Sequence, residues 1–311
     1  MKKRKKLPLK MRTIIKSLKK IKKESILPVS ILVAGEEDVG KNSLIDRLAI
    51  GSNEVFSTVE LSDKNILPDF ASRLRKANLI LVVVDVTGKI SKRIKNLLTY
   101  LEESKLPFLL VINKIDLPKN LEAQLEPASN YLGKFVSKLV LISVKKDINI
   151  NNELIPAIID RSGEKKLSLA VSLPVFKLPI IEEIIKSTAA QNAAIAGIPI
   201  YPGANMPILT TNQIKMILKI AVVYDKEIDV SRAKEVIMVV GGGFTFRAIA
   251  RGLVSFLPVI GLVTKAAIAY CGTVAIGKTA NKYFEKGISD LSVDETWDMA
   301  AEAARKLKVV N

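Results

Sequence analysis

Histidine is absent from this 311-residue sequence, and cysteine occurs once, at Cys271. Without histidine the chain can build no Ser-His-Asp triad, no histidine metal site and no histidine proton relay. A single cysteine allows no disulfide within the chain, which fits a reducing cytosolic compartment. Histidine-based chemistry is therefore excluded before any motif is considered.

The first 23 residues contain no acidic side chain, but they hold 12 of the 48 lysines and arginines. The rest of the chain has 36 basic against 31 acidic residues, so most of the net charge of +17 lies in this arm. The length exceeds that of a usual single domain, and 49% hydrophobic with 25% charged residues is a globular balance. We expect two folded domains behind a basic arm at residues 1–27.

An amphipathic helix is predicted within the arm, because apolar residues recur there at helical spacing. These residues are Met11, Ile14, Ile15, Leu18 and Ile21. Lysines and arginines fill the other positions and interrupt any apolar run long enough for a signal peptide. Such a helix can lay its stripe on an anionic membrane surface through residues 1–23, which we favour. Nucleic acid is a weaker alternative, and so is a plain tail or a helix packed on the second domain.

A phosphate-binding loop is predicted after a short apolar strand at residues 31–34. The loop and the start of the next helix comprise Gly35, Glu36, Glu37, Asp38, Val39, Gly40, Lys41, Asn42 and Ser43. The two glycines allow the loop to wrap, its N–H groups form an anion nest, and Lys41 reaches the outer phosphates. The pattern requires Ser or Thr after the lysine as a Mg²⁺ ligand. This chain has Asn42 there, so we expect weakened metal binding.

A guanine-recognition motif of the NKxD type follows a second buried strand at residues 108–112. Asp116 would accept hydrogen bonds from guanine N1 and N2, which adenine cannot supply. Asn113 would buttress the loop, and the aliphatic stem of Lys114 would lie along the base. The motif therefore predicts selection of guanine over adenine.

A third strand, at residues 139–142, ends in a sequence similar to the SAK motif, which caps the base from the other side: Ser143, Val144 and Lys145. Three motifs in this order, each at the carboxyl end of a strand, would meet where doubly wound sheets bind ligands. They predict an α/β fold with a mostly parallel sheet. The chain here resembles the Era-like, TRAFAC-class P-loop GTPases. The resemblance implies binding of GTP or GDP together with Mg²⁺.

The metal and switch side of that pattern is depleted. Asp85 ends a strand, but only one helix and one strand separate it from the guanine motif, where GTPase topology has two such units. We interpret Asp85 as a structural residue. Asp63 has the required spacing and joins Asn42 as a candidate metal ligand, although Ile66 replaces the glycine that should follow. No switch threonine or glutamine can be assigned, so we expect nucleotide binding with weak or absent hydrolysis.

The second domain is predicted to be all helical, beyond a polar junction at residues 161–166. The loop at residues 198–207, the glycine triplet at 241–243 and residues 269–273 resemble the YcjF-type domain of unknown function. That domain is found in bacteria behind Era-like GTPase domains. The apolar residues 252–277 fit a buried helical hairpin, which we favour, or a membrane-embedded one.

The expected domains after the arm are a guanine-nucleotide-binding domain at 28–160, a helical domain at 167–288 and a helical tail at 289–311. The leading hypothesis is a regulatory GTP-binding protein in the cytoplasm, peripheral at the inner face of the membrane, with an unidentified protein partner. An RNA- or ribosome-associated assembly GTPase and a non-hydrolysing nucleotide-binding scaffold are the alternatives. No catalytic residue can be assigned from the sequence.

Overall fold

The computed structural model describes residues 9–50, 54–61, 68–198, 205–224 and 262–286. It divides into two compact units. The sheet unit comprises residues 27–179, and the helical unit combines the residues before Leu27 with those after Pro179. Each unit has its own buried core.

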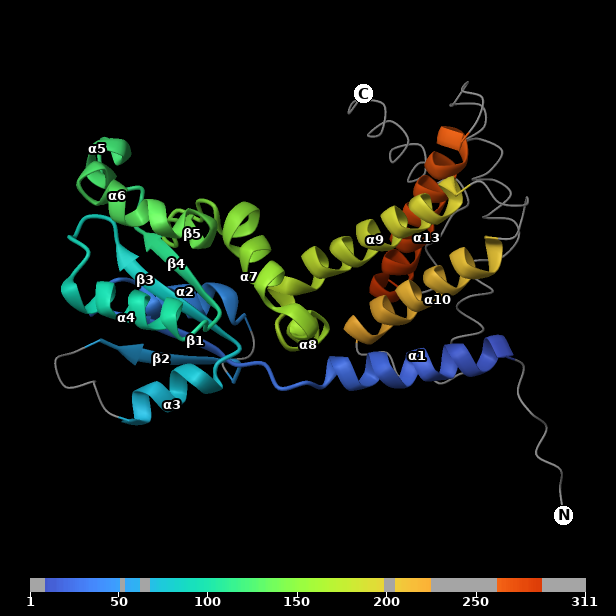
Figure 1. Cartoon of the computed structure of the whole chain (residues 1–311), viewed down its shortest axis with the longest axis horizontal. Coiled ribbons are helices and arrows are strands. Elements are labelled where there is room, and N and C mark those ends of the chain that lie inside the picture. The colour runs from blue at the N-terminus through green and yellow to red at the C-terminus, as the bar shows by residue number, and fades with distance from the viewer. Residues whose placement is uncertain (1–8, 51–53, 62–67, 199–204, 225–261, 287–311) are drawn as a thin grey trace, which may run out of the picture. The chain divides into compact units, whose positions relative to one another are not determined.

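Five parallel strands form the sheet in the order β2-β1-β3-β4-β5 (Figure 1). They are β1 (Ile31–Gly35), β2 (Phe56–Glu60), β3 (Leu79–Asp85), β4 (Phe108–Asn113) and β5 (Leu139–Leu141). The central strands are runs of Val, Ile and Leu because helices cover both of their faces. The chain moves outward from β1 to β2 and returns to the other side of β1 at β3. The carboxyl ends of β1 and β3 therefore flank the topological switch point, as predicted for a doubly wound sheet.

Helices pack on both faces of the sheet, and Figure 1 shows α4 and α2 on opposite sides of it. One face is covered by α3 and α4, whose apolar residues share a core with alternate residues of β1, β3 and β4. The buried side of α2 lies outside that core and contacts β1 and β2. The helices of this unit are α2 (Lys41–Leu48), α3 (Pro68–Lys76), α4 (Lys92–Glu103), α5 (Leu121–Leu125), η1 (Glu126–Ala128), α6 (Ser129–Leu132), η2 (Gly133–Lys138), η3 (Ile150–Leu154), α7 (Ile155–Arg161), η4 (Gly163–Lys165) and α8 (Lys166–Ser172).

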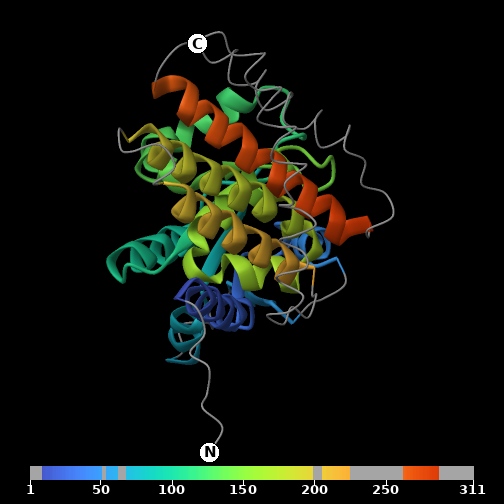
Figure 2. The same cartoon turned by 90° about the vertical axis from the view of Figure 1, so that its right-hand side faces the viewer.

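The helical unit is built from α1 (Leu9–Ser25), most of α9 (Pro174–Gly197), α10 (Met206–Val223) and α13 (Leu262–Lys286). Figure 2 shows α9, α10 and α13 packed together. A buried polar network joins the three helices: Thr273 Oγ1 accepts from Asn192 Nδ2 at 3.0 Å and from Gln213 Nε2 at 3.1 Å. All three side chains are buried, so these bonds satisfy groups that would otherwise be costly in an apolar interior.

The boundary between the units differs from the predicted junction at residues 161–166. Helix α8 continues the sheet unit, where Lys165 Nζ donates to the carbonyl of Pro28 at 2.9 Å and Ser168 donates to that of Leu27. These bonds tie the segment after α7 to the chain that enters β1. The division falls instead within α9, after Pro179. The polar residues of the predicted junction thus do not mark the boundary, because side chains such as that of Lys165 form hydrogen bonds within the sheet unit.

Part of the predicted second domain lies outside the described residues. The glycine triplet, the tail at 289–311, most of the 198–207 loop and residues 252–261 belong to that part, whereas 262–277 lie in α13. Within the described chain, one helix, α10, is long and apolar enough to cross a membrane, and half of it is buried inside the protein. Core helices of soluble proteins have the same character, so this length and composition do not distinguish the two settings.

Candidate functional site

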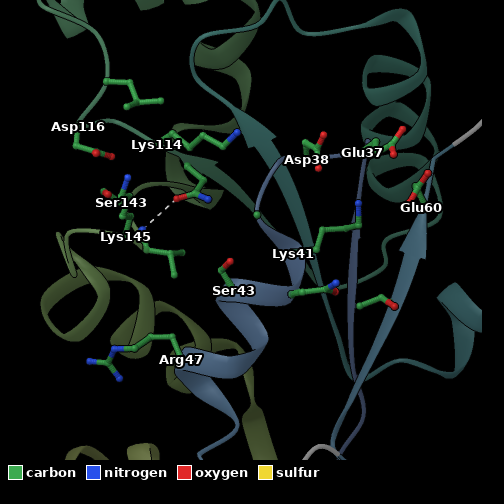
Figure 3. Close-up of a pocket in the computed structure, with 16 residues that line it drawn as sticks. Glu37, Asp38, Lys41, Ser43, Arg47, Glu60, Lys114, Asp116, Ser143 and Lys145 are labelled. Carbon is green, nitrogen blue, oxygen red and sulfur yellow. Dashed lines mark hydrogen bonds between the residues drawn. The ribbon is translucent and has the colours of Figure 1, made fainter.

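A cavity of about 1050 Å³ opens at the carboxyl ends of the strands in the sheet unit. Its walls come from the β1–α2 loop, β2, the segment after β4 and the segment after β5 (Figure 3). Twelve of the predicted site residues line it: Glu37, Asp38, Gly40, Lys41, Asn42, Ser43, Asn113, Lys114, Asp116, Ser143, Val144 and Lys145. The structure thus brings the three sequence motifs together. Gly35, Glu36 and Val39 belong to the same loop without lining the cavity, and Asp63 lies outside the described residues.

The two glycines of the β1–α2 loop are required by the space around them. A Cβ on Gly35 would lie 2.5 Å from the carbonyl oxygen of Val83 on β3, which is too close for any side chain. Gly40 has a φ of +92°, and a Cβ there would lie 2.5 Å from Nδ2 of Asn113. Asp38 also has a positive φ, of 56°. The backbone therefore turns tightly into α2, as an anion-binding loop must.

Lys41 is the first residue of α2 and is 9% exposed. Its ammonium donates to the carbonyl of Glu36 across the loop. Figure 3 shows Lys41 reaching toward the side of the cavity where Glu37, Asp38 and Glu60 lie. A buried ammonium at the start of a helix, beside a loop of backbone N–H groups, is suited to hold a phosphate group.

Asn113 joins the two halves of the site. It is 3% exposed, and its Nδ2 donates to the carbonyl of Val39 at 2.9 Å, while its Oδ1 accepts from the N–H of Val144 at 3.1 Å (dashed in Figure 3). The first bond holds the phosphate-type loop, and the second holds the segment after β5. The buttress predicted for Asn113 is therefore present in the structure, with both of its partners identified.

Lys114 has a φ of 66°, and its ammonium forms an ion pair with Asp85 at 2.6 Å. Asp85 also accepts from the N–H and the hydroxyl of Thr87, at 2.8 and 2.7 Å. Partial burial acts to raise the pKa of Asp85, but the bonds from Lys114 and Thr87 outweigh it and lower that pKa. Asp85, at the end of β3, thus holds the Lys114 side chain.

The far wall is a short loop closed on itself after β5. Ser143 is fully buried, and its backbone pairs with that of Ile148 while its Oγ accepts from the N–H of Lys146 at 3.1 Å. Arg47 of α2 donates two hydrogen bonds to the Asp147 carboxylate of this loop, at 2.8 and 3.2 Å. The hydrogen bonds from Arg47 lower the pKa of the Asp147 carboxyl. The wall that would cap a base is therefore tied to the helix that starts at the phosphate-type loop.

Sequence reasoning missed four residues that line the cavity: Arg47, Thr58, Glu60 and Leu117. Thr58 and Glu60 are exposed and alternate with buried Val59 on β2, and Glu60 pairs in register with Gly35. Strand alternation, applied to β2 beside the loop, could have identified both. Asp63, the carboxylate predicted from the sequence, follows β2 by three residues along the chain.

The cavity offers oxygen donors of the kind that Mg²⁺ prefers: the Asn42 amide, the hydroxyls of Ser43 and Thr58, and the Glu60 carboxylate. Across the described part of the chain, no three acidic, cysteine or histidine residues cluster into a metal site of their own. Mg²⁺ usually binds through one or two carboxylates together with substrate phosphates. The donor set therefore fits a metal that arrives with a phosphate ligand.

The sheet order, the glycine loop that opens α2 and the loop after β4 together give the sheet unit the fold of a P-loop α/β domain. No family model matches the chain. The chain is 34% identical to GTPase Era of Borrelia turicatae (strain 91E135) over 79 residues. These residues make up 25% of this chain and 27% of that protein. The chain thus matches about a quarter of the length of this curated relative.

Among solved structures, the chain is similar to a crystal structure of a variant of Aquifex aeolicus Era bound to GDP.AlF4-. The match covers 52% of this chain and 66% of that one, at 20% identity and a TM-score of 0.34.

Proposed function

We propose that the sheet unit binds a guanine nucleotide, GTP or GDP, in this cavity. The observation that carries the proposal is the pair of bonds from Asn113, which join the glycine loop to the wall after β5. A loop for phosphate and a loop for a base are useful together only at the separation of one nucleotide, and a shared buried side chain fixes that separation. The partial similarity to GTPase Era supports the same class of ligand.

Each wall has a role in this proposal. The N–H groups of the loop at 35–43 and the Lys41 ammonium hold the phosphates. Asp116 accepts from guanine N1 and N2, and the segment Ser143–Lys145 covers the other side of the base. Mg²⁺ would be held by Asn42, Ser43, Thr58 or Glu60 together with phosphate oxygens, and it would neutralise phosphate charge. Asp63 stays a candidate ligand from the sequence.

We propose that hydrolysis is slow or absent and that the protein acts as a regulatory switch or as a scaffold with a bound nucleotide. Asn42 in place of a hydroxyl and the lack of an assigned water-positioning residue support this view. We place the protein at the inner face of the membrane, bound peripherally through its basic helix. An RNA-associated assembly GTPase is the alternative, supported by the same positive charge.

Titration of the full-length protein with labelled GDP, GTP and ATP, with and without Mg²⁺, tests the central proposal. We expect guanine nucleotides to bind and ATP to bind at least about a hundredfold more weakly, since adenine leaves the Asp116 carboxylate unpaired. Equal affinities for GTP and ATP would refute it.

Replacement of Asp116 by Asn sharpens the test of the base site. The variant should prefer xanthine over guanine nucleotides, because the amide complements the xanthine edge. Asp160→Asn is the matched control, since Asp160 is exposed on α7 and lies outside the cavity. An Asp116→Asn variant that still prefers GTP would remove Asp116 from the base site.

A further inference from the structure

Helix α1 has two faces, and the structure settles which of them is occupied. Its apolar stripe packs on α10, with Leu18 6% and Ile21 3% exposed. The opposite side carries four exposed lysines at helical spacing, which we call the lysine face: Lys16, Lys19, Lys20 and Lys23. Part of the stripe that the sequence suggested for a bilayer is thus covered by protein: Leu18 and Ile21 are buried, Ile14 and Ile15 are half-buried, and the cations of the opposite side are exposed.

The positive charge of the described chain is concentrated on the same unit. Described residues of the helical unit include 14 lysines or arginines against four acidic residues, whereas those of the sheet unit include 20 against 17. Within α1 the one acidic residue is Glu24, which pairs with Lys20 at 3.5 Å. The lysine face is therefore an exposed cationic strip on a unit that is itself strongly basic.

We propose that the lysine face is a docking surface for an anionic lipid bilayer, with α1 kept on α10. This rests on the membrane location proposed above and replaces insertion of the stripe by electrostatic adsorption. The alternative docking partner, RNA, fits less well. Helix α1 contains no aromatic side chain, so this face lacks the stacking platforms that single-stranded RNA sites use. Lysine ammoniums act as point charges on a surface of headgroups, where geometry is undemanding.

The mode of binding has measurable consequences. Each lysine near an anionic surface strengthens binding about fivefold, so loss of four should weaken it more than about a hundredfold. Adsorption of this kind is screened by salt and requires anionic lipid. A stripe inserted among acyl chains would instead survive high salt and would bind neutral vesicles as well.

The experiment is co-sedimentation of full-length protein with phosphatidylcholine vesicles that contain either no anionic lipid or phosphatidylglycerol. We expect pelleting only with the vesicles that contain phosphatidylglycerol, and only at the lower of two salt concentrations, 0.1 M and 0.5 M NaCl. The reason is that the Debye length is about 10 Å at 0.1 M and less than half of that at 0.5 M, so the attraction between the lysines and the headgroups is screened. Replacing all four lysines of the face by Gln should abolish it. The matched control replaces four exposed lysines of the sheet unit by Gln, namely Lys76, Lys89, Lys92 and Lys119, and should pellet like the parent protein.

Three results would overturn the proposal: equal loss in both quadruple variants, pelleting that persists in 0.5 M NaCl, or a lysine-face variant that still pellets with vesicles. In a parallel arm with RNA in place of vesicles, loss of RNA binding by that still-pelleting variant would assign the face to RNA instead. Labelled GDP titrated into the same preparations separates this inference from the nucleotide site. A parent protein that binds GDP but never pellets would refute the membrane location and the lysine face while leaving the nucleotide proposal intact.

Discussion

Removing the Asn113 side chain should loosen both walls of the cavity before any nucleotide is added. Asn113→Ala deletes the bonds to the Val39 carbonyl and the Val144 N–H, at a position that is 3% exposed. Each bond contributes about 1 kcal/mol, and an unsatisfied buried partner adds about 1–3 kcal/mol. Because Val144 is half-buried and can recruit water, we expect a total of about 2–4 kcal/mol. The peptides at 36–44 and 143–148 should then exchange amide hydrogens about 30- to 1000-fold faster.

Hydrogen exchange followed by mass spectrometry measures this peptide by peptide, which avoids assuming that a protein of two units unfolds in one step. Asn120→Ala is the matched control, since Asn120 caps α5 through one bond to Ala123 N–H, at 3.1 Å, away from the cavity. It should cost about 1 kcal/mol and affect α5 alone. If the two loop peptides exchange in Asn113→Ala as they do in the parent protein, Asn113 does not join the walls.

Other perturbations test separate contacts. Gly40→Ala should abolish nucleotide binding in a titration, because its φ of +92° and the nearby Asn113 amide leave no place for a Cβ; retained affinity would contradict the loop geometry. The lowered pKa of Asp85 means that its pairing with Lys114 stabilises the fold above the unfolded pKa of about 4 and is lost as pH falls through the folded value; an Asp85→Asn variant should lose that part of the acid dependence in unfolding followed by circular dichroism. Burial raises the pKa of the Cys271 thiol to about 11, so iodoacetamide at pH 8 should label native protein far more slowly than urea-unfolded protein, and equal rates would show that α13 is open.

The fold class and the meeting of the motifs followed from strand-end positions alone. Runs such as Phe108–Asn113 read as buried strands, and parallel strands bring their carboxyl ends to one edge, so the phosphate and guanine motifs had to converge. The unit boundary could not be predicted in this way. It depends on tertiary bonds such as that from Lys165 to the Pro28 carbonyl, which a local polar sequence does not reveal.

The amphipathic helix at the N-terminus was predicted correctly, but its hydrophobic periodicity could not name the surface that covers the stripe. A bilayer and an apolar helix are chemically equivalent partners for Leu18 and Ile21. In the structure the partner is the helix α10. The four lysines lie on the opposite side of the packed helix, and the structure leaves all of them exposed.

The predicted metal ligand also depends on whether family spacing or strand geometry is used. Asp63 is predicted as a metal ligand because its spacing from the guanine motif fits the GTPase pattern. Strand alternation and register identify a different carboxylate. Glu60 of β2 pairs with Gly35 and lines the cavity. Mg²⁺-dependent GTP affinity should therefore fall in Glu60→Gln while Mg²⁺-free GDP affinity is unchanged or rises, since the variant also removes a negative charge beside the phosphates. An unaltered Mg²⁺ dependence would exclude Glu60 as the metal-side carboxylate.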